Sequence, residues 1–183
     1  LVVKDDLGVT RVKDVSFNVR AGEIVGIAGD GGNGQFQVHG SRSGMRDQSS
    51  GVVRLMGTPL SLEGHDGAHR ARHAGLAHVP EDRQRMGLVT AFEEWENAIL
   101  GYEGEKQYGK GFILDIAAAK EEAKKRIKEF DIRPANEQLK TANFSGGNQE
   151  KIVLAREMSS DPDVLIVGQP TRGVDIGAIE FIH

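Results

Sequence analysis

The amino-acid sequence predicts an α/β fold, and three observations lead to this prediction. Residues 23–28 form a near-continuous apolar run, typical of a strand buried in a parallel sheet. The glycine-rich segment 29–36 follows it directly, and short apolar runs at 75–79 and 164–167 have the character of further strands. Residues 92–160 are mostly helical in pattern. We therefore expect strands and helices in one chain, with most helices placed between two of the strands.

The composition is that of an ordinary globular protein, and it excludes several classes of function. With 183 residues, 38% of them hydrophobic, the chain can bury one sizeable core. A net charge of -4 argues against general nucleic-acid binding. The absence of cysteine excludes disulfides and thiolate-bound metals, and fits a reducing cytosol. No apolar run approaches the ~20 residues that span a bilayer, and no signal peptide is recognised, so we expect any membrane role to depend on a partner.

The first part of the chain should contain short strands. Residues 1–4 and 9–20 have extended character, and alternating apolar residues support a strand in the second stretch. The alternating residues are Val12, Val15, Phe17 and Val19. After the strand at 23–28, a helix is expected at about 35–46, but its glycines and serines are poor helix formers. We therefore expect that helix to be short or mobile.

The middle of the chain should alternate between strands and helices. A strand is expected at 51–57, a helix at about 66–74 and a strand at 75–79. Within 92–160, one lysine-rich helix has an apolar stripe formed by Ile116, Ala119, Ala123, Ile127 and Phe130. Glutamates interleave with its lysines, which favours a solvated face over an anion-binding one.

Segment 29–36 (GDGGNGQF) has the glycines of a phosphate-binding loop but lacks its reactive side chains. The ordinary pattern is G-x-x-x-x-G-K-[ST], and Gly29 and Gly34 hold its glycine positions. Gln35 and Phe36 replace the lysine and the hydroxyl residue. The residues expected to bind nucleotide are Gly29, Gly32, Asn33, Gly34, Gln35 and Phe36. The loop should approach phosphate closely but react poorly.

Three further segments, taken with this loop, resemble a known family. They read FSGGNQ at 144–149, KIVLAR at 151–156 and DPDVLIVGQPTRGVDIGA at 161–178. In this order and spacing they resemble the ATP-binding cassette of ABC transporters, over almost the whole chain. The residues that match the signature motif are Ser145, Gly146, Gly147, Asn148 and Gln149. Asparagine before glutamine is the variant typical of simple-sugar and nucleoside importers.

Smaller motifs resemble the same family and narrow the group. Residues 170–175 (PTRGVD) match the segment after the second Walker motif, with Asp175 at the D-loop position. Residues 79–88 resemble the Q-loop region, with Glu81 in the glutamine's place. The tail GAIEFIH looks most like the second cassette of simple-sugar and nucleoside importer ATPases, where two cassettes are fused in one polypeptide. The resemblance implies that this chain is the C-terminal half.

The resemblance also implies an architecture, a cofactor and partners. The expected fold is a P-loop NTPase core of the RecA type with an antiparallel β subdomain, both within 1–88 and 161–183 and truncated at the C-terminus. A helical subdomain at 89–160 would carry the signature. ATP is the implied cofactor. A second cassette, such as the N-terminal half of the same polypeptide, and permease subunits are the implied partners, on the cytoplasmic face of the cell membrane.

Four positions depart from the catalytic pattern of the family. Gln35 and Phe36 replace the lysine that neutralises phosphate and the hydroxyl that holds Mg²⁺. Gly168 replaces the aspartate that holds the metal from the other side, and Gln169 replaces the catalytic glutamate. Glu81 and Gln169 are therefore expected to be degenerate catalytic positions, and no metal site is expected.

These departures suggest that two cassettes divide the work unequally. In the family, two cassettes pair head to tail, so each ATP lies between the Walker motifs of one and the signature of the other. The signature glycines, the Ser145 hydroxyl and the helix N-terminus can all donate to a γ-phosphate. We expect this signature to complete the partner's ATP site. This chain's own site should bind nucleotide weakly, with little Mg²⁺ dependence, and the isolated chain should hydrolyse ATP weakly or not at all.

Single motifs also allow other interpretations. Gly29, Gly31 and Gly34 fit the dinucleotide pattern G-x-G-x-x-G, but the next predicted strand ends in Met56 and Gly57, not in the acidic residue that binds ribose. We therefore do not favour a dinucleotide-binding fold.

Two further patterns concern metal and partner binding. His65, His69 and His73 recur at helical spacing as metal ligands would, but the charged residues around them favour a solvated face. Residues 92–100 can form core, with Trp95 and Ile99 on one face. They can also serve both purposes, with Ile99 and Leu100 turned inward and Phe92 or Trp95 turned toward a permease. The alternative function for the whole chain is a non-hydrolysing nucleotide-binding module with a regulatory or scaffold role.

Overall fold

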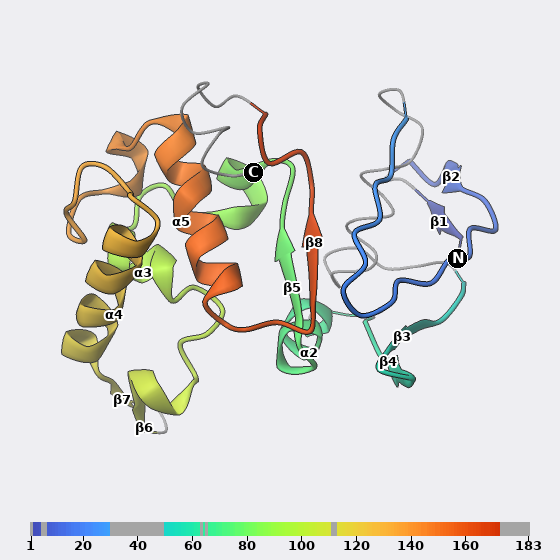
Figure 1. Ribbon diagram of the computed structural model, residues 1–183, viewed down its shortest axis with the longest axis horizontal. Helices are drawn as coiled ribbons and strands as arrows, with labels where there is room; N and C mark the ends of the chain where they lie inside the picture. The colour runs from blue at the N-terminus through green and yellow to red at the C-terminus, as the bar shows by residue number, and fades with distance from the viewer. Residues whose placement is uncertain are drawn as a thin grey trace. The chain divides into compact units, whose positions relative to one another are not determined.

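The computed structural model describes most of the chain and divides it into two compact units. The described residues are 2–4, 7–29, 50–62, 64, 66–110 and 113–172. One unit spans 1–76 and the other 77–183, and each is described by itself (Figure 1). The helix predicted at 35–46 lies outside the described residues.

The first unit opens with a small antiparallel pair. Strand β1 (Val3–Lys4) pairs with β2 (Thr10–Val12), with Val3 opposite Val12 and both side chains buried. The prediction of a strand over 9–20 is correct only for these three residues. Asp14 has a φ of 50°, in the left-handed region, and this turn ends the strand before the predicted alternation can continue.

A tight hairpin follows later in the same unit. Strands β3 (Val53–Leu55) and β4 (Thr58–Leu60) pair antiparallel, and Met56 and Gly57 form the turn with φ values of 49° and 81°. Two successive positive φ values are typical of the type I′ turn, in which glycine is favoured at the second position. The strand predicted at 51–57 is confirmed in its centre, but its hairpin partner was not predicted.

Helix α2 (Gly67–His73) confirms the helix predicted at about 66–74.

The strand predicted at 23–28 is wrong. No residue of 23–28 belongs to a strand, and Ile24 is 99% exposed. At the start of this run the backbone forms a local hydrogen bond: the N–H of Glu23 donates to the carbonyl of Arg20 over 3.0 Å. An apolar run becomes a buried strand only where neighbouring strands pair with its backbone, and no described residues do so here.

In the second unit, the two remaining predicted strands are confirmed. Strands β5 (Leu76–Val79) and β8 (Val164–Val167) lie side by side and point in the same direction (Figure 1). The N–H of Gly168 donates to the carbonyl of Val79 over 2.9 Å, so the pairing reaches past the end of β8. Val79 is fully buried, whereas β8 is only partly covered.

Three helices pack together in the second unit, as the mostly helical pattern of 92–160 predicts. Helix α3 (Glu94–Ala98) contacts both α4 (Ile116–Glu129) and α5 (Gly146–Met158). Asp115 caps α4, because its Oδ1 accepts a hydrogen bond from the N–H of Ala118 at 3.0 Å. Shorter elements connect them: η1 (Arg83–Gly87), η2 (Lys106–Tyr108), β6 (Gly109–Lys110), β7 (Ile113–Leu114) and η3 (Thr141–Asn143).

The apolar stripe predicted for α4 is only partly buried. Ala119, Ala123 and Ile127 are buried, but Ile116 is 51% exposed at the start of the helix. The main core of the unit is formed by Val79, Leu88, Ile127, Ile132, Phe144, Ile152, Val153, Leu154 and Ala155. Trp95 lies partly buried against a second cluster that contains Ile99, whereas Phe92 is 39% exposed. The contact of either residue with a permease stays a prediction.

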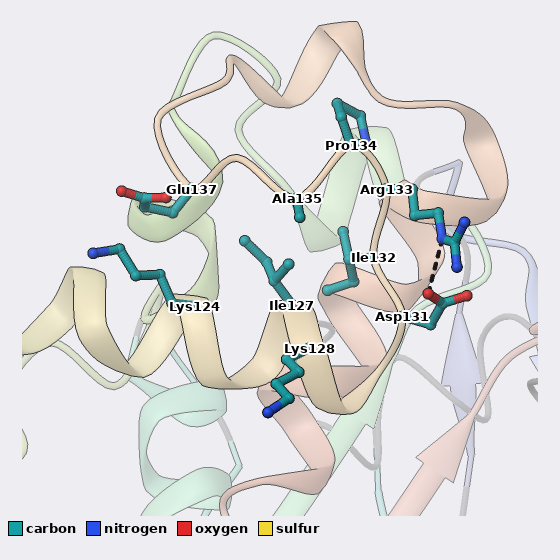
Figure 2. A pocket seen from close by; sticks show the side chains of 9 residues that line it. All are labelled: Lys124, Ile127, Lys128, Asp131, Ile132, Arg133, Pro134, Ala135 and Glu137. Carbon is teal, nitrogen blue, oxygen red and sulfur yellow. Dashed lines mark hydrogen bonds and ion pairs between the residues drawn. The ribbon is translucent and has the colours of Figure 1, made fainter.

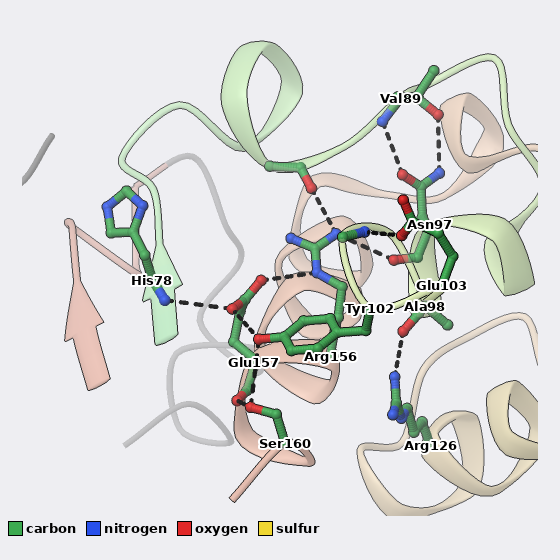
Figure 3. Close-up of polar contacts among 12 residues, drawn as sticks. His78, Val89, Asn97, Ala98, Tyr102, Glu103, Arg126, Arg156, Glu157 and Ser160 are labelled. Atoms are coloured by element: carbon green, nitrogen blue, oxygen red, sulfur yellow. Dashed lines mark hydrogen bonds and ion pairs between the residues drawn. The ribbon is translucent and has the colours of Figure 1, made fainter. Parts of the chain in front are cut away.

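A buried ion pair near the C-terminal end of α5 joins several elements (Figure 3). The Nε of Arg156 donates to Oε1 of Glu157 over 2.9 Å, and both side chains are almost completely buried. The Nη1 of Arg156 also donates to the carbonyls of Gly87 and Asn97, at 2.9 and 3.1 Å. The Oη of Tyr102 donates to Oε2 of Glu157 over 2.9 Å. The pair therefore connects α5 to the end of η1 and to α3.

A second buried carboxyl, Glu94, lies in the first turn of α3. It is fully buried, and neither of its oxygens has a hydrogen-bond partner in the described part of the chain. Burial raises the pKa of Glu94 to about 8; the positive charge of Arg126 opposes the shift and the negative charge of Glu137 adds to it. Glu94 therefore keeps its proton at neutral pH.

We expect Arg156→Ala to destabilise the chain by about 3–5 kcal/mol, because it leaves the Glu157 carboxylate buried without its cation. Lys125→Ala is the control, since Lys125 pairs with Glu122 at the exposed surface of α4, and such a pair contributes at most about 1 kcal/mol. Urea unfolding of both variants measures the difference. Equal losses in the two variants would show that the buried pair does not hold the unit together.

Candidate functional site

Helix α5 begins directly after Ser145, and the side chain of this serine caps the helix. Its Oγ accepts a hydrogen bond from the N–H of Asn148 at 3.4 Å. Serine is favoured at this position because its hydroxyl satisfies one of the N–H groups that the first turn leaves unpaired. Ser145 is exposed and Gly147 is buried. The predicted signature segment therefore forms an exposed helix N-terminus.

The side chain of Asn148 has a fixed orientation. Its Oδ1 accepts a hydrogen bond from the backbone N–H of Arg133 at 2.7 Å, and its Nδ2 donates to Oγ of Ser145 over 2.9 Å. Because the Arg133 N–H can only donate, the atom that faces it must be the amide oxygen. The amide nitrogen must then face Ser145.

This orientation determines what the Ser145 hydroxyl can do. Its oxygen already accepts two hydrogen bonds, both from Asn148. A hydroxyl has two lone pairs and one proton, so the proton remains for an acceptor outside these contacts. The positive end of the helix dipole lies at the same place. Ser145 is thus arranged to donate to an anion.

Gln149, by contrast, is 3% exposed and is used inside the fold. Its Nε2 donates to the carbonyls of Thr141 and Phe144, at 3.1 and 3.2 Å. Its Oε1 accepts a hydrogen bond from Nε2 of Gln84 at 2.9 Å. Gln149 therefore joins the segment before α5 to η1.

Glu81 lies after β5 and is bound by a residue that follows β8. The Nη1 of Arg172 donates to Oε1 of Glu81 over 2.6 Å. The N–H of Arg172 also donates to the carbonyl of Gln169, which forms a turn after β8. The two predicted degenerate positions, Glu81 and Gln169, therefore lie in segments that Arg172 connects.

Gly168 and Gln169 occupy a tight place at the end of β8. A Cβ atom on Gly168 would lie 3.0 Å from the backbone nitrogen of Glu81 and 3.4 Å from its Cα. Gln169 is exposed and has a φ of 45°, in the left-handed region. A side chain at position 168 would therefore begin in tight contact with the backbone of Glu81.

A pocket lies at the C-terminal end of α4 and along the segment that follows it (Figure 2). Its volume is about 530 Å³, and it is lined by Lys124, Ile127, Lys128, Asp131, Ile132, Arg133, Pro134, Ala135 and Glu137. Asp131 accepts a hydrogen bond from Nε of Arg133 at 2.8 Å, and this contact lowers the pKa of Asp131. The pocket adjoins the signature through Arg133, whose N–H holds Asn148.

Two of the three histidines in the predicted pattern belong to the described part of the chain. The rings of His69 and His73 lie 4.0 Å apart, and Nδ1 of His73 lies 3.0 Å from the carbonyl oxygen of His69. His65 lies outside the described residues. No group of three or more metal-binding side chains occurs among the residues that are described.

Several predicted site residues are not described by the structure. Of the predicted phosphate loop, Gly29 is described and exposed. The others, Gly32, Asn33, Gly34, Gln35 and Phe36, lie outside the described residues, as does the predicted D-loop residue Asp175. Arg133 was missed by sequence reasoning, because a contact through its backbone N–H leaves no trace in residue type. Arg172 was recognised only as part of a motif.

Comparison with known proteins identifies the family. The family model described as ABC transporter matches residues 12–172. The chain belongs to this family. The exposed Ser145 belongs to the segment FSGGNQ at 144–149. This segment resembles the signature motif of the family's ATP-binding cassettes.

Curated relatives of this ABC transporter chain are import proteins. It is 39% identical, over all of its 183 residues, to the guanosine import ATP-binding protein NupO of Bacillus subtilis, covering 35% of that protein. It is 40% identical to the nucleoside import ATP-binding protein NupA of Lactococcus lactis subsp. cremoris, covering 36% of it. A xylose import ATP-binding protein, XylG of Burkholderia ambifaria, is 40% identical over 177 residues, 94% of this chain and 33% of XylG. The chain thus spans about a third of these relatives.

Solved structures agree with the predicted fold class. The dimeric, post-hydrolysis structure of the ATP-binding cassette MJ0796, bound to ADP and Pi, superposes with a TM-score of 0.78 at 21% identity, over 99% of this chain and 77% of that one. The ADP form of the cassette MJ1267 gives 0.73 at 20% identity, over 99% of this chain and 71% of that one. The P-loop NTPase fold with mixed α/β content is confirmed. In the described residues, no helix has the length and apolar character that crossing a membrane requires.

We expect Gly168→Ala to destabilise this ABC chain by about 1–3 kcal/mol, because the added methyl group presses on the backbone of Glu81. Gly104→Ala is the matched control, since a Cβ there meets nothing within 4 Å. Thermal unfolding of the two variants measures the contrast. If Gly168→Ala were as stable as the control, the close approach between β8 and Glu81 would not be a constraint.

Proposed function

We propose that this chain is the nucleotide-binding cassette of an ABC importer for a simple sugar or a nucleoside, and that its signature segment completes the ATP site of a second cassette. The sequence relatives support the class of substrate, because their names assign them to import of guanosine, nucleosides, glucose or xylose. The assembled protein would hydrolyse ATP, while this chain by itself would do so weakly or not at all.

The observation that carries the proposal is the arrangement of Ser145. Its hydroxyl accepts two hydrogen bonds from Asn148 and keeps its proton for an external acceptor, at the exposed N-terminus of a 13-residue helix. A γ-phosphate presented by another cassette is an acceptor of the right charge. Donors that are fixed before the charge develops stabilise it without reorganisation. Binding and orienting that phosphate is the role proposed for the signature.

The chain's own site does not fit a Mg²⁺ ion. The metal would need a carboxylate at position 168, but glycine offers no side-chain ligand atom there, and a Cβ at this position would lie 3.0 Å from the backbone nitrogen of Glu81. Gln169 next to it can orient water but cannot accept a proton. We therefore propose that this site binds nucleotide weakly and without metal, and derive no hydrolytic step through it.

The proposed partners follow from the proposal that this chain completes an ATP site on a second cassette. One is a cassette with intact Walker motifs, such as the N-terminal half of the same polypeptide. The others are permease subunits, which would hold the chain at the cytoplasmic face of the membrane. The domain boundaries at 88/89 and 160/161 remain a prediction. The alternative function is a non-hydrolysing regulatory or scaffold module, and only the residues at 168 and 169 favour it. Measuring whether this chain stimulates ATP hydrolysis by a second cassette separates this alternative from the proposed function.

We expect Ser145→Asp to lower strongly the stimulation of ATP hydrolysis that this chain gives to the second cassette of the same transporter. Aspartate also caps helices well, so α5 should remain stable, but it replaces a donor with an anion facing the phosphate. A loss of about 100-fold is expected, as for removal of one transition-state donor. Ser145→Thr, which keeps the hydroxyl, should retain most of the activity. Phosphate release at saturating ATP measures the rates.

Asn148→Asp tests the orientation argument separately. A carboxylate there accepts from both the Arg133 N–H and the Ser145 hydroxyl, so the serine proton turns inward and stimulation falls. Asn136→Asp, in the exposed segment before η3, is the matched control and should behave as wild type. Absence of stimulation by the wild-type chain would reject the proposed function and favour the scaffold alternative. Stimulation that survives Ser145→Asp would reject the role of the signature.

We also expect ATP binding to the isolated chain to depend little on Mg²⁺. Because glycine stands at the metal-binding position, the dissociation constant should change by less than about tenfold, or ~1.4 kcal/mol, when EDTA replaces the metal. Isothermal titration with ATP in both buffers measures it. A much larger Mg²⁺ effect would contradict the proposed loss of the metal site.

A further inference from the structure

Arg83 joins two segments of the second unit that lie far apart in the sequence. Its Nη1 donates to the carbonyl of Arg172, in the turn after β8, over 2.9 Å. The same nitrogen lies 3.5 Å from Oε2 of Glu150, in the first turns of α5. The side chains of Arg83 and Glu150 are 13% and 3% exposed. Arg83 thus lies between the signature helix and the turn that contains Gln169.

Neighbouring residues strengthen the same connection. The Nε2 of Gln84 donates to Oε1 of Gln149, so two successive residues of η1 contact two successive residues of α5. From the other side, the side chain of Arg172 returns to Glu81 over 2.6 Å. Residues 81–84 therefore contact the signature helix at one end and the turn after β8 at the other.

Glu150 makes this connection sensitive to position. Its Oε1 has no hydrogen-bond partner in the described part of the chain, so the ion pair with Arg83 is its main compensation. Burial raises the pKa of Glu150 to about 7, and Arg83, the charged group that acts on it from η1, opposes this shift. A displacement of Arg83 would favour the neutral acid and weaken the bridge further.

We propose that Arg83 is a positioning residue, which through Glu150 and the Arg172 carbonyl fixes the signature turn relative to the turn after β8. The inference rests on the proposed function, in which Ser145 must meet a phosphate held by another cassette. A donor that must reach another protein's ligand needs a helix held at a fixed place. The planar guanidinium of arginine carries donors in a rigid geometry, so one side chain can serve a carbonyl and a carboxylate together.

The first test measures ATP hydrolysis by the second cassette in the presence of this chain. Arg83→Gln should lower the stimulated kcat about tenfold, while the KM for ATP stays within about twofold, because ATP binds first to the other cassette's Walker motifs. Arg83→Lys keeps the charge and should recover part of the rate. Arg85→Gln is the matched control, from the same turn and exposed, and should leave the rate unchanged.

A second arm uses the pH profile. With wild-type chain, stimulated kcat should fall as pH drops through about 7, because protonation of Glu150 removes the charge that holds Arg83. Glu150→Gln mimics the protonated form, so its kcat should be low at all pH values and lack this inflection. Arg83→Gln combined with Glu150→Gln should be no slower than Arg83→Gln alone, since both remove one bridge.

A third arm separates this inference from the proposed function. Hydrogen exchange of the Arg172 amide, which donates to the Gln169 carbonyl, is measured in the chain alone. Arg83→Gln should speed this exchange and Arg85→Gln should not. If the wild-type chain stimulates hydrolysis but Arg83→Gln matches Arg85→Gln in rate and exchange, the positioning role is wrong. If no chain stimulates hydrolysis, the proposed function fails, and unchanged exchange in Arg83→Gln would then also reject the bridge.

Discussion

The buried pair of Arg156 and Glu157 is the constraint on which the second unit depends. An ion pair that is removed from water is stable only when the other hydrogen-bond donors and acceptors of both side chains also have partners. Here the partners come from the end of η1, from α3 and from Tyr102. The C-terminal half of α5 is therefore fixed in depth and rotation. Because a helix is stiff along its axis, the same contacts determine where Ser145 stands at the other end.

The two ends of α5 show different uses of polar groups. Near its C-terminus, polar atoms are buried and bonded within the chain, whereas at its N-terminus Ser145 is exposed and keeps one proton for an external acceptor. The end of β8 is different again, because Gly168 offers no side-chain ligand atom, and a Cβ there would lie only 3.0 Å from the backbone nitrogen of Glu81. This contrast supports the proposed function, in which this chain assists ATP hydrolysis at a site formed mainly by a second cassette.

Sequence reasoning found those parts whose cause is local. The Ser-Gly-Gly start of α5, the strands β5 and β8 and the helix α2 follow from capping, apolar runs and helical spacing. It failed at 23–28, since the run is apolar but the pairing of a strand depends on neighbours elsewhere in the chain. The β3–β4 hairpin was not predicted, because Met56 stands where recognisable type I′ turns have asparagine, aspartate or glycine. The contact between the Arg133 N–H and Asn148 could not be predicted, because it depends on how the loop after α4 folds back.

Glu94 makes folding of this chain a proton-binding reaction. Its pKa is about 8 in the folded state against an ordinary value of 4.5, so between these values the unfolded chain has released a proton that the folded chain retains. Over this range the free energy of unfolding falls as pH rises, by up to about 1.4 kcal/mol per pH unit for one proton. Unfolding near neutral pH then releases that proton to the buffer. The calorimetric heat of unfolding will therefore contain the buffer's own enthalpy of ionisation, and will differ between phosphate and Tris at the same temperature.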